Sequence, residues 1–313
     1  MDIVGVCILG GSGFVGAAIA DQACARGYRV RVVTRNTMKT RPLLVLPTLE
    51  VMVADPNDEA ALARCLEDMD AVVNLVGILH PGGRTTFESA HVDLPRKLVQ
   101  ACRSAGVRRL LHMSALGASP TGPSEYLRSK ARGEAAVRNA PADLSHTIFR
   151  PSVIFGEHDR FLNLFAQLAH FFPVIPLAHA QARFQPIWVE DVARCYVAAL
   201  EDPRTFGQVY ELGGPRAYAL EDLVRFVCET LGVRRSIVAL PDALAQLQAL
   251  VFERLPGKLI TRDNLRSMSV DNVCAGPFPP VFGFAPASLE VVAPAYLAAH
   301  GSRYDRYRHH AGR

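Results

Sequence analysis

Short β-branched segments alternate with amphipathic segments through the first half of the chain, and this alternation constrains the fold more than any other sequence feature. The segments typical of strands are 3–9, 28–34, 49–54, 71–77 and 108–114. Apolar residues recur at helical spacing in 14–26, 57–66, 86–105 and 124–139, and Asn57 can cap the second of these helices. Strands that alternate with helices pair in parallel through right-handed crossovers. We therefore expect an α/β protein with a doubly wound parallel sheet of the Rossmann type.

The second half of the chain is less regular. Further strands are indicated at 146–156 and 207–214, and further helices at 188–201, 219–231 and 241–255. We expect an NADP(H)-binding Rossmann domain over 1–150, for reasons developed below. A smaller substrate-side region over 151–300 would be interleaved with the sheet, and a flexible basic tail would occupy 301–313.

Composition excludes several classes of protein. Half of the 313 residues are hydrophobic and a fifth are charged, so the chain can bury a large core and is not disordered. A net charge of +4 is too small to indicate a nucleic-acid partner. The seven cysteines include no C-x-x-C pair, which favours reduced thiols in a cytosol, and no metal-ligand spacing is visible. Nothing in the sequence indicates an oligomeric state.

Neither a leader nor a membrane span is predicted. The N-terminus enters a strand almost at once, which leaves no room for a signal or transit peptide and favours a cytoplasmic location. The longest apolar region, 161–180, is interrupted by polar residues and two prolines, so we expect it to pack in a core rather than to span a bilayer.

A glycine-rich turn follows the first strand and opens the first helix. Glycine at these spacings permits a tight turn, close approach of a pyrophosphate and close packing of helix on sheet. A glycine pattern alone is weak, but this one lies in the first strand–helix unit, where dinucleotides bind. The cofactor-binding residues predicted here are Gly10, Gly11, Ser12, Gly13, Phe14, Val15 and Gly16.

The end of the second strand predicts which dinucleotide binds. An NAD site normally carries an acid here that holds the ribose hydroxyls, whereas this chain has Thr34-Arg35-Asn36, with Lys39 and Arg41 beyond. A charge-assisted hydrogen bond to a 2′-phosphate contributes about 1.5–3 kcal/mol. We therefore expect NADP(H) and assign Arg35 to the cofactor site. The alternative is that these residues are ordinary surface cations.

Tyr126 and Lys130 lie four residues apart in a predicted helix and so share one face. A free phenol titrates near pH 10, and lowering its pKa to near 7 takes about 4 kcal/mol of preference for the phenolate. A neighbouring ammonium group and an oxidised nicotinamide could supply that preference. The pair is therefore a candidate acid–base site, or a cofactor-holding remnant of one.

These motifs resemble the short-chain dehydrogenase/reductase superfamily in its extended or atypical branch, which includes the NAD-dependent epimerase/dehydratases. The resemblance covers nearly the whole chain through 10–16, 53–58, 74–77, 126–130, 150–156 and 185–193. It implies that Asp55 contacts the adenine and that Asn74 lies beside the cofactor. It also implies that the stretch from Pro151 to Val153 lies along the nicotinamide. The further cofactor-binding positions that it implies are Val76 and Gly77.

A narrower resemblance concerns segments 126–134, 149–163, 173–177 and 185–193, which are similar to the NADPH-binding accessory subunits of respiratory complex I and their bacterial relatives. In the mitochondrial subunits NADPH is regarded as structural, and some relatives are linked to ubiquinone metabolism. The resemblance implies complex I subunits or a membrane surface as partners.

The chain departs from an active reductase after the fifth strand. Family enzymes place a hydroxyl there to hold the substrate oxygen, but here Ser114 ends the strand and Ala115 and Leu116 follow. Ser114 either serves as the third catalytic group or only bonds locally. Losing such a donor reduces a reaction rate about a hundredfold. Two functions remain. One is a scaffold stabilised by NADPH and associated with complex I or ubiquinone-related machinery. The other is an NADPH-dependent oxidoreductase, epimerase or dehydratase that uses Tyr126, Lys130 and Ser114 on a carbonyl or nucleotide-sugar-like substrate.

Two further features have alternative interpretations. Asp159 and Arg160 form either an anion-recognising pair or a helix cap with a surface ion pair. An apolar stripe runs along 240–255, followed by arginines and a lysine. Such a helix either rests on a membrane or a partner, or covers the substrate-side region, which is the interpretation that amphipathicity alone favours.

Overall fold

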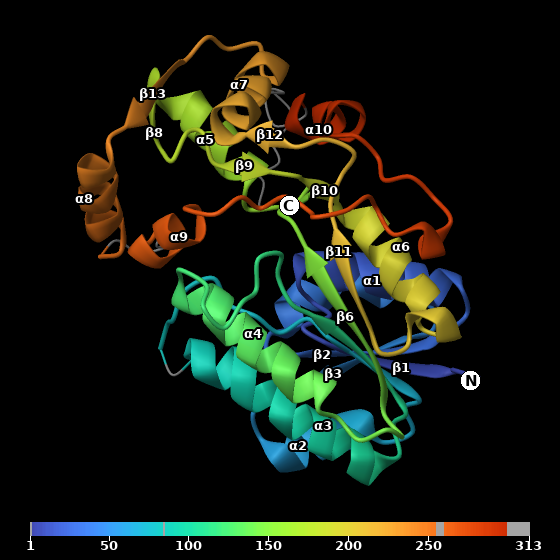
Figure 1. The fold of residues 1–313 in the computed structure, drawn as a ribbon. Coiled ribbons are helices and arrows are strands. Elements are labelled where there is room, and N and C mark those ends of the chain that lie inside the picture. The colour runs from blue at the N-terminus through green and yellow to red at the C-terminus, as the bar shows by residue number, and fades with distance from the viewer. Residues whose placement is uncertain (1, 84, 255–259, 299–313) are drawn as a thin grey trace. The chain divides into compact units, whose positions relative to one another are not determined.

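The computed structural model describes residues 2–83, 85–254 and 260–298. The chain forms two compact units (Figure 1). Of the described residues, the first unit contains 2–83, 85–151, 189–212 and 275–284, and the second contains 152–188, 213–254, 260–274 and 285–298. Each unit is therefore built from segments that are not continuous in sequence. The predicted tail 301–313 lies outside the described residues.

A seven-stranded sheet forms the centre of the first unit, and all of its neighbouring strands are parallel, as the strand–helix alternation predicts. The strand order is β11-β6-β5-β4-β1-β2-β3. The strands are β1 (Gly5–Leu9), β2 (Arg29–Thr34), β3 (Leu49–Val53), β4 (Ala71–Asn74), β5 (Arg109–Met113), β6 (Ser145–Pro151) and β11 (Gln208–Leu212). Strand order reverses direction at β1, so the carboxyl ends of β1 and β4 border the switch point where ligands bind in such sheets.

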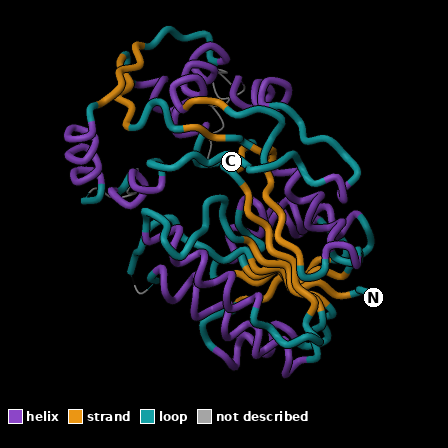
Figure 2. Tube along the Cα trace, in the orientation of Figure 1, coloured by secondary structure: helices purple, strands orange, loops and turns teal. Residues whose placement is uncertain are grey.

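Helices cover both faces of this sheet (Figures 1 and 2). On one face α1 (Phe14–Ala25) packs against α6 (Val189–Ala199). On the other, α3 (Leu94–Ala105) lies between α2 (Glu59–Leu66) and α4 (Glu125–Arg138). β1 and β4 are completely buried, as expected for parallel strands covered on both sides. The prediction that Asn57 caps α2 is wrong, because Asp58 Oδ1 accepts the hydrogen bond from Ala60 N at 2.9 Å.

Arg109 on β5 is fully buried and joins the sheet to the end of α6. Its guanidinium donates hydrogen bonds to the carbonyl oxygens of Ala199 at 2.7 Å and Leu200 at 3.2 Å. It also donates to the hydroxyls of Thr147 at 2.6 Å and Thr205 at 3.0 Å. Burial lowers the pKa of Arg109 to about 9, so the group remains cationic at neutral pH. Arg109 therefore stabilises this part of the fold as a buried donor of several hydrogen bonds.

The second unit has its own core and three two-stranded sheets. Its strands are β7 (Ile154–Phe155), β8 (Val174–Ala178), β9 (Arg183–Phe184), β10 (Ile187–Trp188), β12 (Tyr218–Ala219) and β13 (Ser236–Leu240). Its helices are α5 (Leu162–Phe171), α7 (Leu220–Thr230), α8 (Asp242–Phe252), α9 (Arg262–Ser267) and α10 (Leu289–Leu297). α7 packs against both α5 and α10 around a shared apolar cluster. A separate small cluster lies under α8.

The predicted apolar region 161–180 is divided in this unit between α5 and β8. Asp159 accepts hydrogen bonds from the backbone N–H groups of Leu162 at 2.7 Å and Asn163 at 3.3 Å, at the start of α5, which supports the capping interpretation of this residue. Over the described ranges, no helix combines the length and the apolar character needed to cross a bilayer. All seven cysteines are free thiols, and six of them are buried.

Candidate dinucleotide and acid–base site

The glycine turn joins β1 to α1 through a backbone that only glycine accommodates at two points. Gly10 has a φ of +81°, in the left-handed region. A Cβ atom on Gly16 would lie 2.5 Å from the carbonyl oxygen of Gly10, so the first turn of α1 rests directly on the loop. α1 carries no acidic residue in its first turn. Its positive dipole end is therefore available to an anion such as a pyrophosphate.

Ser12 and Thr34 connect this turn to the end of β2. Their hydroxyl oxygens lie 2.8 Å apart, and Asn36 caps a 3₁₀ segment, Thr37–Val45, by accepting a hydrogen bond from Met38 N at 2.9 Å. The Asn36 side chain is therefore engaged in this cap. Arg35, its neighbour in sequence, is the charged residue at the carboxyl end of β2. Among the described residues, Arg35 has no carboxylate within ion-pair distance.

Arg35 lines a pocket of about 680 Å³ beside β2 and β3. The pocket-lining residues are Arg35, Asp55, Asn57, Thr85, Ser89, Asp93, Arg96, Lys97 and Gln100. A hydrogen bond from the Asn57 backbone N–H is the main cause that lowers the pKa of Asp55, and Arg35 adds a smaller effect. Lys97 donates to the Asn57 carbonyl oxygen at 3.0 Å and lies 3.4 Å from Glu59. The pocket thus joins two predicted cofactor residues, Arg35 and Asp55, and carries three cations.

Asn74 ends β4 and orders the loop that carries Val76 and Gly77. Its Oδ1 accepts a hydrogen bond from Val76 N at 3.2 Å, and its Nδ2 donates to His112 Nδ1 at 3.2 Å. A Cβ atom on Gly77 would lie 3.1 Å from Lys130 Nζ. The absence of a side chain at Gly77 therefore lets this loop approach the lysine closely.

Tyr126 and Lys130 lie on α4, whose first turn is capped by Ser124 Oγ. Lys130 Nζ donates to the Met113 carbonyl oxygen at 3.1 Å, and burial lowers its pKa to about 8, with Glu134 acting in the opposite direction. Burial raises the pKa of Tyr126 to about 12. This shift is opposite to the lowering expected for an activated tyrosine. Burial of Tyr126 therefore favours the neutral phenol.

His91 is a site residue that the sequence analysis missed. It lies in a single π-helical turn, Ser89–Asp93, and its Nε2 accepts a hydrogen bond from Ile78 N at 3.0 Å. Its Nδ1 donates to Ser129 Oγ at 2.8 Å. The Ser129 hydroxyl accepts this bond because it donates its own proton to the Tyr126 carbonyl oxygen at 2.8 Å. Burial, with a smaller effect from Lys130, lowers the pKa of His91 to about 2. His91 is thus a neutral imidazole that ties the Gly77–Ile78 loop to the tyrosine helix.

The sequence carried one indirect signal for this arrangement. Gly133 lies inside α4, where glycine is unfavourable for a helix. A Cβ atom there would lie 2.0 Å from the His91 carbonyl oxygen. The glycine therefore marks the point where α4 crosses the π-helical turn.

Ser114 follows β5 and is buried, with its backbone N–H donating to the Phe149 carbonyl oxygen at 2.7 Å. Within the described chain, its hydroxyl and His112 Nε2 are buried polar atoms without a hydrogen-bond partner. Ser114 lies two positions after His112 as the chain continues from β5, so the two side chains face the same side of the sheet. Ala115 and Leu116, where a hydroxyl would be expected in family enzymes, are buried apolar residues.

Pro151 and Val153, the remaining predicted cofactor residues, belong to different units. Pro151 ends β6 in the first unit, and its carbonyl oxygen accepts from Leu116 N at 3.0 Å. Val153 is the second residue of the second unit, where its N–H donates to Asn272 Oδ1 at 3.2 Å. Across the three described ranges, no group of three His, Cys, Asp or Glu residues could hold a metal ion.

Comparison with known proteins identifies a matching protein family and several relatives of this chain. The model of the NAD dependent epimerase/dehydratase family matches residues 6–213. The chain is 30% identical over 302 residues to NADH dehydrogenase (ubiquinone) 1 alpha subcomplex subunit 9 of Rattus norvegicus, covering 94% of this chain and 79% of the relative. Identity to the same subunit of Mus musculus is 34% over 226 residues. That match spans 70% of this chain and 59% of the mouse protein, so the chain covers about three fifths of that relative's length.

Other matches come from bacteria. The chain is 32% identical over 240 residues to a protein named ceramide reductase from Caulobacter vibrioides, covering 76% of this chain and 74% of that protein. Among solved structures, a nucleoside-diphosphate-sugar epimerase from Staphylococcus aureus superposes with a TM-score of 0.71 at 18% identity. That superposition covers 94% of this chain and all of the epimerase, and it demonstrates a shared fold.

Proposed function

Because this chain belongs to the NAD dependent epimerase/dehydratase family, we propose that it binds NADP(H) and that the cofactor serves largely to stabilise the fold. The chain is homologous to the complex I alpha subcomplex subunit 9 and to enzymes of the family. The proposed role lies in complex I or ubiquinone-related machinery, as the name of the mitochondrial relative suggests.

The preference for a phosphorylated adenosine is supported by charge at the end of β2. Arg35 extends into the pocket that Asp55 and Asn57 also line, and no carboxylate stands at this strand end to hold ribose hydroxyls. When bound, the cofactor would place its pyrophosphate at the N-terminus of α1 and its 2′-phosphate at Arg35. The close packing of Gly16 on Gly10 fits this role, because a bare backbone can approach the pyrophosphate.

Arg35→Gln tests the cofactor preference. The loss of a charge-assisted hydrogen bond should weaken NADPH binding about ten- to a hundredfold and leave NADH binding unchanged. Arg41→Gln is the matched control, since Arg41 is exposed on the same segment but does not line the pocket. Isothermal titration of the parent protein and of both variants with NADPH and with NADH gives the six affinities. Equal affinity of the parent protein for NADPH and NADH would contradict the assignment.

A structural role for the cofactor is supported by the state of the acid–base residues. The pKa of Tyr126 is raised to about 12, and the Lys130 ammonium is engaged with the Met113 carbonyl oxygen. The segment after Ser114 offers apolar side chains where a reductase would present a hydroxyl. A ligand present at about a thousand times its dissociation constant adds about 4 kcal/mol to the free energy of unfolding. Binding alone could therefore hold this fold together.

An alternative function is that of an active NADP(H)-dependent oxidoreductase, epimerase or dehydratase. It is favoured by the placement of Tyr126 and Lys130 on one helix face beside Gly77, and by the relative named ceramide reductase. In this case Tyr126 Oη would exchange a proton with the substrate oxygen, and Ser114 would donate a hydrogen bond to that oxygen. Lys130 would stabilise the phenolate. The bound cofactor would supply or accept the hydride.

Tyr126→Phe separates the two functions. An enzyme should lose turnover of a carbonyl substrate by at least about a hundredfold, while NADPH affinity stays unchanged. A scaffold should show no turnover in either protein and a large rise in melting temperature when NADPH is added. A turnover that survives in Tyr126→Phe would contradict the assigned role of the tyrosine.

The location and partners are also part of this proposal. We place the protein in the cytoplasm, with complex I subunits or a membrane surface as its partners. Homology to subunit 9, which is named as a mitochondrial protein, supports the complex I partners. The cytoplasmic location is supported by the cysteine pattern, which favours reduced thiols. Cross-linking of the full chain in membranes and in the soluble fraction would test this placement, and recovery without any respiratory subunit would argue against a complex I partner.

A further inference from the structure

Helix α8 in the second unit packs inward through two alanines and exposes three of its large apolar residues. Ala245 and Ala249 are buried in the small cluster beneath it. Leu244, Leu247 and Val251 are 52%, 56% and 49% exposed. Residues spaced by three and four lie on one side of a helix, so these three form a single apolar face. α8 does cover part of the second unit, as one of the two interpretations expects, but it does so through these alanines, whereas the three exposed residues of the stripe point to solvent.

The strand pair that precedes α8 exposes apolar side chains as well. β13 pairs in parallel with β8, with Val238 opposite Pro176, and α8 follows after Pro241. Val174 and Val238 are each 47% exposed, and Phe172 just before β8 is 54% exposed. Since α8 packs against β8, both features lie at the same edge of the second unit (Figure 1). Clustered exposed apolar side chains of this kind mark interaction surfaces.

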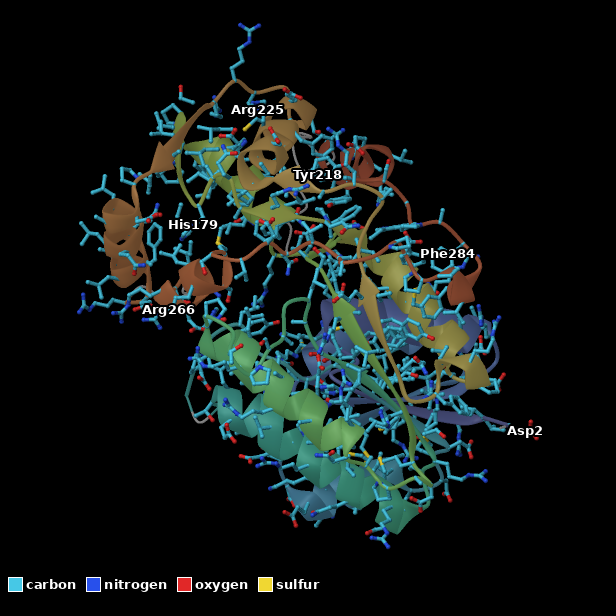
Figure 3. All side chains as sticks on the ribbon, in the orientation of Figure 1. Asp2, His179, Tyr218, Arg225, Arg266 and Phe284 are labelled. Atoms are coloured by element: carbon cyan, nitrogen blue, oxygen red, sulfur yellow. The ribbon has the colours of Figure 1, made fainter. Side chains whose placement is uncertain are left out.

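The charged residues next to the α8 face include three arginines. Arg254 follows the helix, and Arg262 and Arg266 lie on α9, which packs against α8. Arg262 is paired with Glu253 at 3.0 Å. Arg254 and Arg266 are exposed and have no ion-pair partner among the described residues, and Figure 3 shows the Arg266 side chain at the α9 edge of the unit. The helical period places Asp242 and Glu253 on the side opposite Leu247. Asp263, also on α9, is partly buried and has an interaction partner of its own. Among the described residues beside the apolar face, the exposed charges without an ion-pair partner are therefore Arg254 and Arg266.

We propose that the α8 face docks on the surface of an anionic lipid bilayer. Leu244, Leu247 and Val251 enter the boundary between headgroups and acyl chains, and Arg254 and Arg266 bind lipid phosphates. Helices with an apolar face and flanking cations bind bilayers in this way. A second copy of the chain fits less well, because a self-complementary contact would bring the arginines of both copies together. The proposal specifies the membrane surface that the proposed function gives as one partner and rests on that part of it, but it does not depend on the cofactor or on any catalytic activity.

Co-sedimentation of the full chain with vesicles tests the apolar contribution. We expect binding to vesicles of phosphatidylcholine mixed with phosphatidylglycerol. Val251→Gln should weaken that binding roughly threefold to tenfold, because a half-buried valine is lost from the interface. Val291→Gln is the matched control, since Val291 is 78% exposed on α10 of the same unit and should leave binding unchanged. Equal losses in the two variants would overturn the proposal.

The electrostatic contribution has its own matched pair. Arg266→Gln should weaken binding about fivefold on the mixed vesicles and have no effect on vesicles of phosphatidylcholine alone. Arg225→Gln is the control, because Arg225 is an exposed cation on α7, away from α8 in Figure 3. Equal binding of the parent protein to both vesicle types would overturn the proposal. So would the absence of vesicle binding together with a dimer that Val251→Gln dissociates in sedimentation velocity, since that result assigns the face to a second copy.

Discussion

Two buried histidines make the first unit sensitive to acid. His91 and His112 are each 2% exposed. Burial is the main cause that lowers their pKa values, to about 2 for His91 and about 3 for His112, and the positive charge of Lys130 adds to it. A histidine in the unfolded chain titrates near pH 6.5. Because the folded pKa lies below the unfolded one, this contribution to stability is complete above about pH 6.5 and is lost as the pH falls toward the folded value.

The magnitude follows from the number of protons taken up on unfolding. Between about pH 7 and about pH 5 each histidine becomes protonated in the unfolded state and stays neutral in the folded state. The free energy of unfolding should therefore fall by about 2 kcal/mol for each histidine, or about 4 kcal/mol for both. Carboxylates add to the total pH dependence, but they do so equally in the parent and in a histidine variant.

Urea denaturation at the two pH values measures this effect. Circular dichroism is the appropriate signal, because the only tryptophan, Trp188, lies in the second unit. His112→Gln and His91→Gln should each reduce the loss of stability between the two pH values by about 2 kcal/mol. His158→Gln, which replaces an exposed histidine, should not change it. An unchanged pH dependence in both buried-site variants would refute the inference that these imidazoles are neutral in the folded protein.

Two further substitutions test the packing that supports the site. Arg109→Met should lower the free energy of unfolding by about 3 kcal/mol, because it leaves buried carbonyl and hydroxyl acceptors unpaired. Arg108→Met, at the adjacent exposed position, is the control and should change it by less than about 0.5 kcal/mol in the same urea titration. Gly133→Ala should cost about 3 kcal/mol, since its Cβ would lie 2.0 Å from the His91 carbonyl oxygen. Gly276→Ala, where a Cβ meets nothing within 4 Å, is the control, and equal thermal shifts in the two glycine variants would contradict the proposed crossing.

Element positions in the first unit could be predicted from the sequence because they depend on local periodicity. The segments expected at 14–26 and 124–139 correspond to α1 and α4. Where the prediction fails, a distant contact is the cause. The helix expected over 86–105 is interrupted by the π-helical turn at Ser89–Asp93, because α4 crosses there at Gly133. The strand expected over 71–77 ends at Asn74, whose side chain bonds instead to Val76 N and His112.

The sequence by itself determined the parallel α/β fold, the glycine turn after β1 and the shared helix face of Tyr126 and Lys130. Each of these depends on residues within a few positions of one another, where spacing and backbone preference are sufficient. Only the tertiary structure determines which polar groups are buried away from solvent. Burial among elements distant in sequence raises the pKa of Tyr126 to about 12 and keeps His91 neutral. It also decided that α8 packs through Ala245 and Ala249 and leaves Leu244 and Leu247 exposed, because helical spacing identifies a face but not what covers it.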